Sequence, residues 1–153
     1  MTAVLQRVRR AAVCVDGATV GECEEGLYIL LGVGKDDTER DAEALAEKIV
    51  NLRIFTDEVG KMNLSLLDID GEMLVVSNFT LLASYRKGKR PDYLGAASPN
   101  VANRLYEYFI DLCRKHVRRV QSGEFGAHMI SEISTDGPVT IVMDSKVLIP
   151  SER

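Results

Sequence analysis

The first third of the chain alternates between apolar runs and short polar turns. Small and branched apolar residues recur at strand spacing over 3–15, and the Asp16–Gly17 pair then supplies a hairpin turn. A second strand is predicted over 18–23, and a polar turn leads into a continuous apolar run over 27–33. Such a run is typical of a strand buried on both faces. The pattern therefore predicts a three-stranded meander.

Two later segments carry the spacing of amphipathic helices. Either Asp37 or Thr38 can cap the first, and Asp41 follows Thr38 by three residues, as in a capping box. The second begins after Ser98, with Pro99 at its first position. The predicted apolar faces are Ala42, Leu45, Ala46, Ile49 and Val50 on the first helix, and Val101, Leu105, Tyr108, Phe109 and Leu112 on the second.

The other apolar segments predict shorter strands, at 52–55, 73–82, 127–134 and 139–143. Residues 84–98 are rich in Gly, Pro and Lys without a clear period, which predicts a long surface loop, often a functional feature. Two helices are too few to cover a parallel doubly wound sheet. We therefore expect an α/β protein of the α+β type, in which antiparallel-rich sheets form a barrel with two outer helices.

Composition limits the class of protein and its partners. The 153 residues are 46% hydrophobic and 27% charged, as expected for one folded domain over 1–153. No apolar run approaches the ~20 residues of a membrane-spanning helix, so we expect a soluble cytoplasmic protein with no membrane partner. The net charge of −4 disfavours generic nucleic-acid binding through counterion release. Any contact with nucleic acid must be local.

Basic residues gather at two places. Those in the predicted long loop surround Gly88, and the segment is either a solvated loop or a site for one or two phosphates. The second cluster lies at the predicted end of the second helix, where positive charge complements the negative helix terminus. The clusters are Arg86, Lys87, Lys89 and Arg90, and Arg114, Lys115, Arg118 and Arg119.

Cysteine and histidine spacing indicates no metal site. Cys14, Cys23 and Cys113 form no CxxC pair and are interpreted as small core hydrophobes. His116 and His128 belong to no HExxH pattern or Cys/His ligand set. The GxGxxG, GxxxxGK[ST] and GxSxG patterns are absent as well. We therefore expect neither a metal nor another cofactor.

Two segments concentrate short polar groups beside strands, at 77–81 and 135–140. Ser77 and Thr80 are candidate hydroxyl nucleophiles, but no His stands nearby in sequence to activate them, and the alternative is a pair of strand hydroxyls bonded to backbone. Gly137–Pro138 indicates a turn before a strand, because proline removes a ladder donor. The sequence leaves open whether this peptide is cis.

Both segments resemble motifs of the D-aminoacyl-tRNA deacylase family. Residues 77–81 are similar to its SQFTL motif, and residues 137–140 match its GPVT motif. Two positions depart from the pattern: Asn78 stands where glutamine is usual, and Thr135 stands where asparagine is usual. Further matches extend over nearly the whole chain, at 5–8, 53–55, 60–63, 88, 90–91, 97–99, 125–127 and 129.

The resemblance implies a barrel-like homodimeric enzyme without a cofactor. Its reaction would hydrolyse the ester between a D-amino acid, or glycine as on mischarged tRNA(Ala), and the terminal adenosine of tRNA. In the family, a cis Gly-Pro motif enters the partner subunit's site, where backbone carbonyls exclude the side chain of an L-amino acid. Gly137 and Pro138 match this chiral filter.

The resemblance also implies roles for residues of the site. Ser77, Asn78, Phe79 and Thr80 would line the pocket, with backbone amides near Phe79 holding the ester carbonyl. The adenosine 2′-hydroxyl would help to activate water, and the alternative gives Thr80 the role of nucleophile or orienting hydroxyl. Positions around the adenosine are matched by Ala97, Phe125 and Met129, among which Phe125 could stack on the base. The expected contacts to the tRNA acceptor stem are Arg86, Lys87, Lys89 and Arg90.

Two other classes of function stay open at this point. One is a non-catalytic nucleic-acid-binding dimer of the same fold, suggested by the departures at Asn78 and Thr135. The other is a hydrolase of unrelated small esters, which would require Thr80 and would act without RNA.

Overall fold

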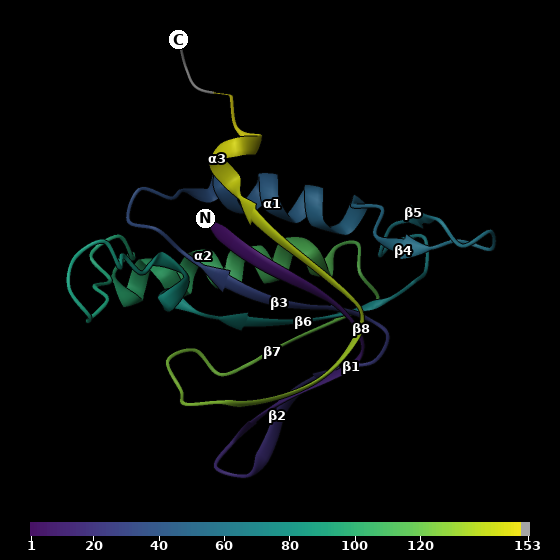
Figure 1. The fold of residues 1–153 in the computed structure, drawn as a ribbon, viewed down its shortest axis with the longest axis horizontal. Helices are drawn as coiled ribbons and strands as arrows, with labels where there is room; N and C mark the ends of the chain where they lie inside the picture. Colours follow the sequence, from purple (N-terminus) through teal and green to yellow (C-terminus); the bar gives the residue numbers. More distant parts are fainter. Residues whose placement is uncertain (151–153) are drawn as a thin grey trace.

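One six-stranded mixed sheet organises the molecule. The computed structural model describes residues 1–150, in which the strand path runs β2–β1–β3–β6–β7 and β8 pairs with the other edge of β1. Two long helices, α1 (Glu39–Asn51) and α2 (Pro99–Arg114), pack against the sheet (Figure 1). The strands are β1 (Thr2–Val15), β2 (Ala18–Cys23), β3 (Gly26–Gly32), β6 (Glu72–Ser77), β7 (Arg119–Ser122) and β8 (Ile130–Asp144).

The two ends of the strand path approach each other. The backbone N–H of Glu22 in β2 donates a hydrogen bond to the side-chain oxygen of Gln121 in β7, at 2.9 Å. This contact leaves a nearly closed barrel-like sheet, which confirms the predicted fold class. The pairs of β1 with β2, β3 and β8 are antiparallel, whereas β3–β6 and β6–β7 are parallel.

The three strands of the predicted meander and its first turn form, but their order differs from a meander. Strand β1 is long enough to pair with β3 along its first half and with β2 along its second half, so β3 lies beside β1 instead of β2. Both residues of the first turn have left-handed backbone angles, with φ of 49° at Asp16 and 80° at Gly17, which suits a two-residue hairpin loop. Alternate residues of β3 face opposite sides of the sheet. Leu27, Ile29 and Leu31 join the core beneath the helices, and Tyr28 joins a smaller core on the other face. The strand is therefore buried on both faces, as its apolar run predicts.

Helix α1 has the predicted cap and apolar face. Thr38 is its N-cap, the Thr38 backbone N–H donates to the Asp41 carboxylate at 2.8 Å, and every residue of the predicted face is buried. Helix α2 is rotated relative to its prediction. Val101 is exposed and both Tyr108 and Leu112 are only half-buried, because part of the helix packs against α1 as well as the sheet. The buried residues of α2 are Ala102, Leu105, Tyr106, Phe109, Ile110 and Cys113.

Two predicted strands have different bounds. Residues 52–54 form no strand, because Leu52 ends α1; the local pair is instead β4 (Phe55–Thr56) with β5 (Met62–Leu64). The strand predicted over 73–82 ends at Ser77. The next residue, Asn78, donates its backbone N–H to the Leu31 carbonyl at 2.8 Å. The chain leaves the sheet there and forms the 3-10 helix η1 (Phe79–Leu82). This turn exposes residues that a continuing strand would have buried.

The two closing strands predicted at 127–134 and 139–143 are one strand, β8. Its pairing with β1 skips from Gln6↔Thr140 to Val8↔Thr135, so residues 136–139 bulge out opposite Arg7. A bulge leaves residues unpaired, which accommodates a proline that lacks an N–H. Gly137–Pro138 thus lies inside a strand instead of between two. The Gly137–Pro138 peptide is cis.

Only part of the second basic cluster lies at the end of α2, with Arg114 in the last turn and Lys115 at the C-cap, while Arg118 and Arg119 make ion pairs. Arg119 in β7 donates to the carboxylate of Glu72 at 3.0 Å, and Arg118 lies 3.4 Å from the Asp70 carboxylate. The side chain of Glu72 is buried in β6, and a buried carboxylate requires such partners. Arg114 donates to the carbonyl of Val120. These contacts join the β6–β7 pair to the end of α2.

Cys23 and Cys113 are core residues, as predicted, whereas Cys14 is only half-buried and belongs to neither core cluster. Burial raises the pKa of the Cys23 and Cys113 thiols to about 12. Among residues 1–150, no helix is both long and apolar enough to cross a membrane.

A buried carboxylate joins the start of α1 to the short helix α3 (Ser145–Leu148). Asp41 accepts hydrogen bonds from the Lys146 ammonium at 2.8 Å and from the Ser145 hydroxyl. Burial alone would raise the pKa of Asp41, but these bonds and the Thr38 backbone N–H outweigh it and hold that pKa well below its usual range. The ionised form therefore stabilises the fold.

We predict that Asp41→Asn lowers stability at pH 7 and flattens its acid dependence. A carboxyl whose pKa is depressed by folding stabilises the native state above its unfolded pKa of about 3.9, and this contribution is lost as the pH falls below that value. Urea unfolding at pH 7 and pH 3 measures the effect, with Asp16→Asn in an exposed turn as control. An equal difference between wild type and Asp41→Asn at both pH values would contradict the assignment.

Candidate active site

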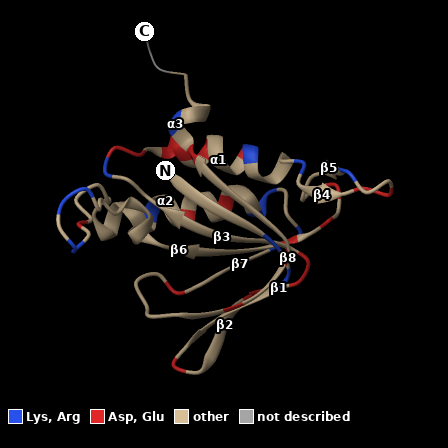
Figure 2. Ribbon diagram, in the orientation of Figure 1, with Lys and Arg blue, Asp and Glu red and all other residues tan. Residues whose placement is uncertain are grey.

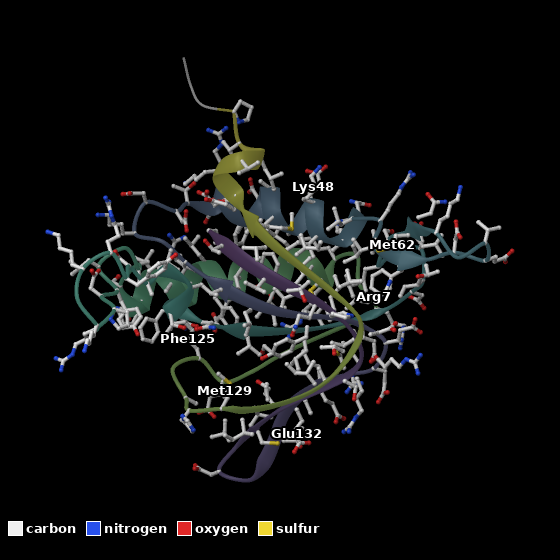
Figure 3. All side chains as sticks on the ribbon, viewed as in Figure 1. Arg7, Lys48, Met62, Phe125, Met129 and Glu132 are labelled. Atoms are coloured by element: carbon white, nitrogen blue, oxygen red, sulfur yellow. The ribbon has the colours of Figure 1, made fainter. Side chains whose placement is uncertain are left out.

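A cavity of about 780 Å³ opens where the parallel strands β3 and β6 end. Its walls come from these strands, η1, the 93–97 segment, the start of α2 and the connection between β7 and β8. Figure 3 shows Phe125 on that connection, toward α2, with Met129 further along it. The fold thus gathers segments far apart in sequence around one space.

The cavity brings together most of the predicted site residues. From the first motif, all four predicted positions line it, and so do the three positions predicted around an adenosine. These residues are Ser77, Asn78, Phe79, Thr80, Ala97, Phe125 and Met129.

Gly137 and Pro138 do not line this cavity; they are exposed on the bulge of β8. Arg7 holds that bulge in place. Its Nε donates to the Asp136 carbonyl and its Nη1 donates to the Ile54 carbonyl, each at 2.9 Å. Gly137 has φ of 139°, and a Cβ atom there would lie 2.7 Å from the backbone nitrogen of Val139, so the position requires glycine.

The predicted basic loop is exposed and lies beside the site without lining it. Backbone hydrogen bonds between Ser84 and Asp92, at 2.8 and 2.9 Å, close its base. In Figure 2 its basic residues form a blue tip next to the start of α2. Tyr93, which follows this base, packs edge-on against Phe79 with ring centroids 5.0 Å apart. The loop is therefore tied to the cavity mouth.

Asn78 and Thr80 are joined within the site. The Thr80 hydroxyl donates to the side-chain oxygen of Asn78 at 2.5 Å. Its proton therefore faces a neutral amide oxygen instead of a base, and its own oxygen can accept a hydrogen bond from a ligand. His128 lines the same cavity, but within residues 1–150 no hydrogen bond links it to Thr80.

The sequence did not predict three aromatic residues of the cavity wall, Tyr28, Tyr93 and His128. Tyr28 stands in an apolar strand and looks like a core residue, yet its hydroxyl meets the Ser131 hydroxyl at 2.8 Å on the cavity wall. Burial raises the pKa of Tyr28, so this group stays neutral. Arg7 was also missed as a site residue, because it is one of three arginines in β1, with Arg9 and Arg10, and no local signal singles it out.

A family model described as D-Tyr-tRNA(Tyr) deacylase matches residues 4–144. The chain belongs to this family. It is 58% identical to the D-aminoacyl-tRNA deacylase of Thermosipho africanus and 60% identical to that of Caldicellulosiruptor saccharolyticus, in each case over 95% of this chain and 98% of the relative. The enzyme therefore has D-aminoacyl-tRNA deacylase activity.

Two solved structures share the fold. A c-Myc DNA unwinding element binding protein has a TM-score of 0.89 and 41% identity, over 94% of this chain and 98% of its own. A probable eukaryotic D-amino acid tRNA deacylase has a TM-score of 0.83 over 94% of this chain and 100% of its own, at 18% identity. The second likeness concerns the fold alone.

The cavity suits ester hydrolysis by a deacylase in two ways. The backbone N–H groups of Phe79 and Thr80 begin η1, and the first N–H groups of a helix have no acceptor within it. Such donors can stabilise the oxyanion that forms when water attacks an ester carbonyl. The apolar part of the wall leaves room for apolar groups beside these donors.

Proposed function

We propose that the cavity holds the 3′ end of D-aminoacyl-tRNA, and that a second copy of the chain completes it. The supporting observation is the separation between the seven gathered residues and Gly137–Pro138. A chiral filter must touch the substrate, but this motif is exposed on the bulge, away from the lining of its own cavity. Ile130 and Val142 on β8 are 58% and 71% exposed, apolar surface that a second subunit would cover. The active form is thus a homodimer.

In this proposal, backbone groups of the enzyme select the D-ester over the L-ester. A wall of backbone held by Arg7 cannot move aside for an L side chain, so an L-ester is rejected by steric and polar penalty. Glycine has no side chain to exclude. Glycyl-tRNA mischarged on tRNA(Ala) is therefore a second substrate. Because these substrates are intermediates of translation, the enzyme works in the cytoplasm.

The chemical step uses the RNA as well as the protein. Water attacks the ester carbonyl, the adenosine 2′-hydroxyl helps to take up its proton, and the 3′-oxygen leaves with a proton, which yields free amino acid and tRNA. Thr80 and Ser77 orient the ester or the water, with the Thr80 hydroxyl directed by Asn78. Phe125 and Met129 pack on the adenine, and Ala97 lies beside it.

We expect Gly137→Ala to relax chirality. The added Cβ meets the Val139 backbone and φ of 139° is strained for alanine, so the filter must change shape. The ratio of D-Tyr-tRNA to L-Tyr-tRNA deacylation rates should fall by at least about tenfold. Gly17→Ala is the control, since Gly17 also has positive φ (80°) but lies in a hairpin turn. An unchanged ratio in Gly137→Ala would remove the filter from this motif.

Thr80→Val tests the assignment of the chemical step. An orienting hydroxyl predicts a fall in kcat of about tenfold or less, while a terminal 2′-deoxyadenosine lowers the wild-type rate by about a hundredfold or more. The alternative, Thr80 as nucleophile, predicts near-complete loss with Thr80→Val, retained activity with Thr80→Ser, and cleavage of simple D-aminoacyl esters. Single-turnover kinetics distinguish the two.

The basic loop is proposed to contact phosphates of the acceptor stem. Replacing its four basic residues, Arg86, Lys87, Lys89 and Arg90, by alanine should raise KM and make log KM less steep against log salt, because fewer counterions are released. The control replaces Lys48, Arg53 and Lys61, which lie near the α1–β5 end of the molecule. Equal salt slopes for wild type and the loop variant would reject this contact.

A non-catalytic role remains an outcome of the same experiments. The structural relative named for DNA binding makes it worth testing. Tight tRNA binding without hydrolysis of either ester would favour it.

A further inference from the structure

A second cavity adjoins the first across one aromatic ring. It measures about 340 Å³, and Phe125 lines both spaces. Behind Phe125, a Cβ atom on Gly123 would lie 2.6 Å from the Met129 sulfur, so glycine lets Met129 pack closely there. The polar residues of the second cavity come mainly from α2 and β7, including Asn103, Glu107 and Ser122.

Asn103 lines this cavity and carries an unsatisfied polar atom. Among the buried side-chain nitrogen and oxygen atoms of residues 1–150, the Asn103 side-chain oxygen alone has no hydrogen-bond partner. An unpaired buried acceptor is costly, so it indicates a place where a ligand donates a hydrogen bond. Glu107 stands one helical turn further along the same helix and lines the same cavity, adding a second acceptor.

The other polar groups around the cavity are already engaged. The Tyr106 hydroxyl donates to the Val75 carbonyl at 2.9 Å and also forms a hydrogen bond with the Ser122 side chain, so both side chains are engaged. Arg114 donates to the Val120 carbonyl and lies 3.6 Å from the Asp111 carboxylate at the far end. The groups free to read a ligand are therefore the Asn103 amide and its acidic neighbour.

We propose that this cavity binds the base of the nucleotide that precedes the terminal adenosine, which is cytidine in tRNA. The inference rests on the proposed function, which places the adenine on the other side of Phe125. Cytosine offers an N4 amino donor beside an N3 acceptor, and a side-chain amide supplies the matching acceptor and donor. Uracil carries an O4 acceptor in place of the amino group, so in the same orientation it would place that acceptor against the Asn103 oxygen and the Glu107 carboxylate.

The size and shape of the cavity agree with a single base. Small-molecule sites span about 300–1,000 Å³, and this cavity lies at the small end of that range. Unstacked RNA bases are commonly held on aromatic side chains and read along their Watson–Crick edges. Phe125 can thus separate two consecutive bases while contacting both.

The test uses amide-linked, non-hydrolysable D-tyrosyl analogues of adenosine, CpA and UpA, titrated calorimetrically into the intact wild-type protein. We expect the CpA analogue to bind about tenfold more tightly than the UpA analogue, the discrimination typical of one paired base edge. Asn103→Leu should bring the two affinities together. Arg104→Ala is the matched control on the same helix, because Arg104 pairs with Glu39 outside the cavity, and it should keep the difference.

Equal wild-type affinities for the CpA and UpA analogues, with measurable binding of the adenosine analogue, would overturn the subsite and leave the proposed function intact. Failure of the adenosine analogue to bind would overturn the proposed function and the subsite with it. The wild-type comparison holds whether or not Asn103→Leu folds.

Discussion

The pairing of β1 with β8 is the constraint on which the rest of the structure depends. It extends from Thr2↔Asp144 to Cys14↔Ile130, while the opposite edge of β1 is divided between β3 and β2. Because a one-residue slip would turn every side chain to the other face, this register is strongly fixed by the buried residues of β1. It places the β7–β8 connection at the cavity and the Gly137–Pro138 bulge opposite Arg7. One ladder therefore positions both parts of the proposed site.

The site combines little ionisable chemistry with much fixed backbone. Its cavity lies at the carboxyl ends of parallel strands, a common place for ligands in sheets of this kind. The reacting groups proposed here are backbone donors, two hydroxyls and the RNA itself. The reaction rate therefore depends more on the accurate positioning of these groups than on the strength of a protein base. The acidic net charge of −4 is compatible with an RNA substrate that is contacted locally, and one exposed loop carries four basic residues, Arg86, Lys87, Lys89 and Arg90.

Local pattern predicted the first three strands, α1 and the barrel-like fold, and the first motif together with Ala97, Phe125 and Met129 predicted residues that share one cavity. It failed where tertiary contacts decide. The turn after Ser77 depends on a hydrogen bond from Asn78 to Leu31, and the buried face of α2 depends on α1. The continuity of β8 through Gly137–Pro138 depends on its partner strand, which no local signal at proline reveals. Tyr28 meets Ser131, and Arg7 meets Asp136 and Ile54, so the roles of both residues depend on partners far away in the sequence.

The bulge of β8 also bears on solubility. Within residues 1–150, β8 pairs on one side only, which leaves a long strand edge open to further pairing. Long regular edges are templates for aggregation, and natural proteins interrupt them with bulges and prolines. At residues 136–139 the unpaired segment divides this edge into two shorter runs, and Pro138 offers no N–H. The segment proposed to select substrates thereby also guards the isolated chain against uncontrolled sheet growth.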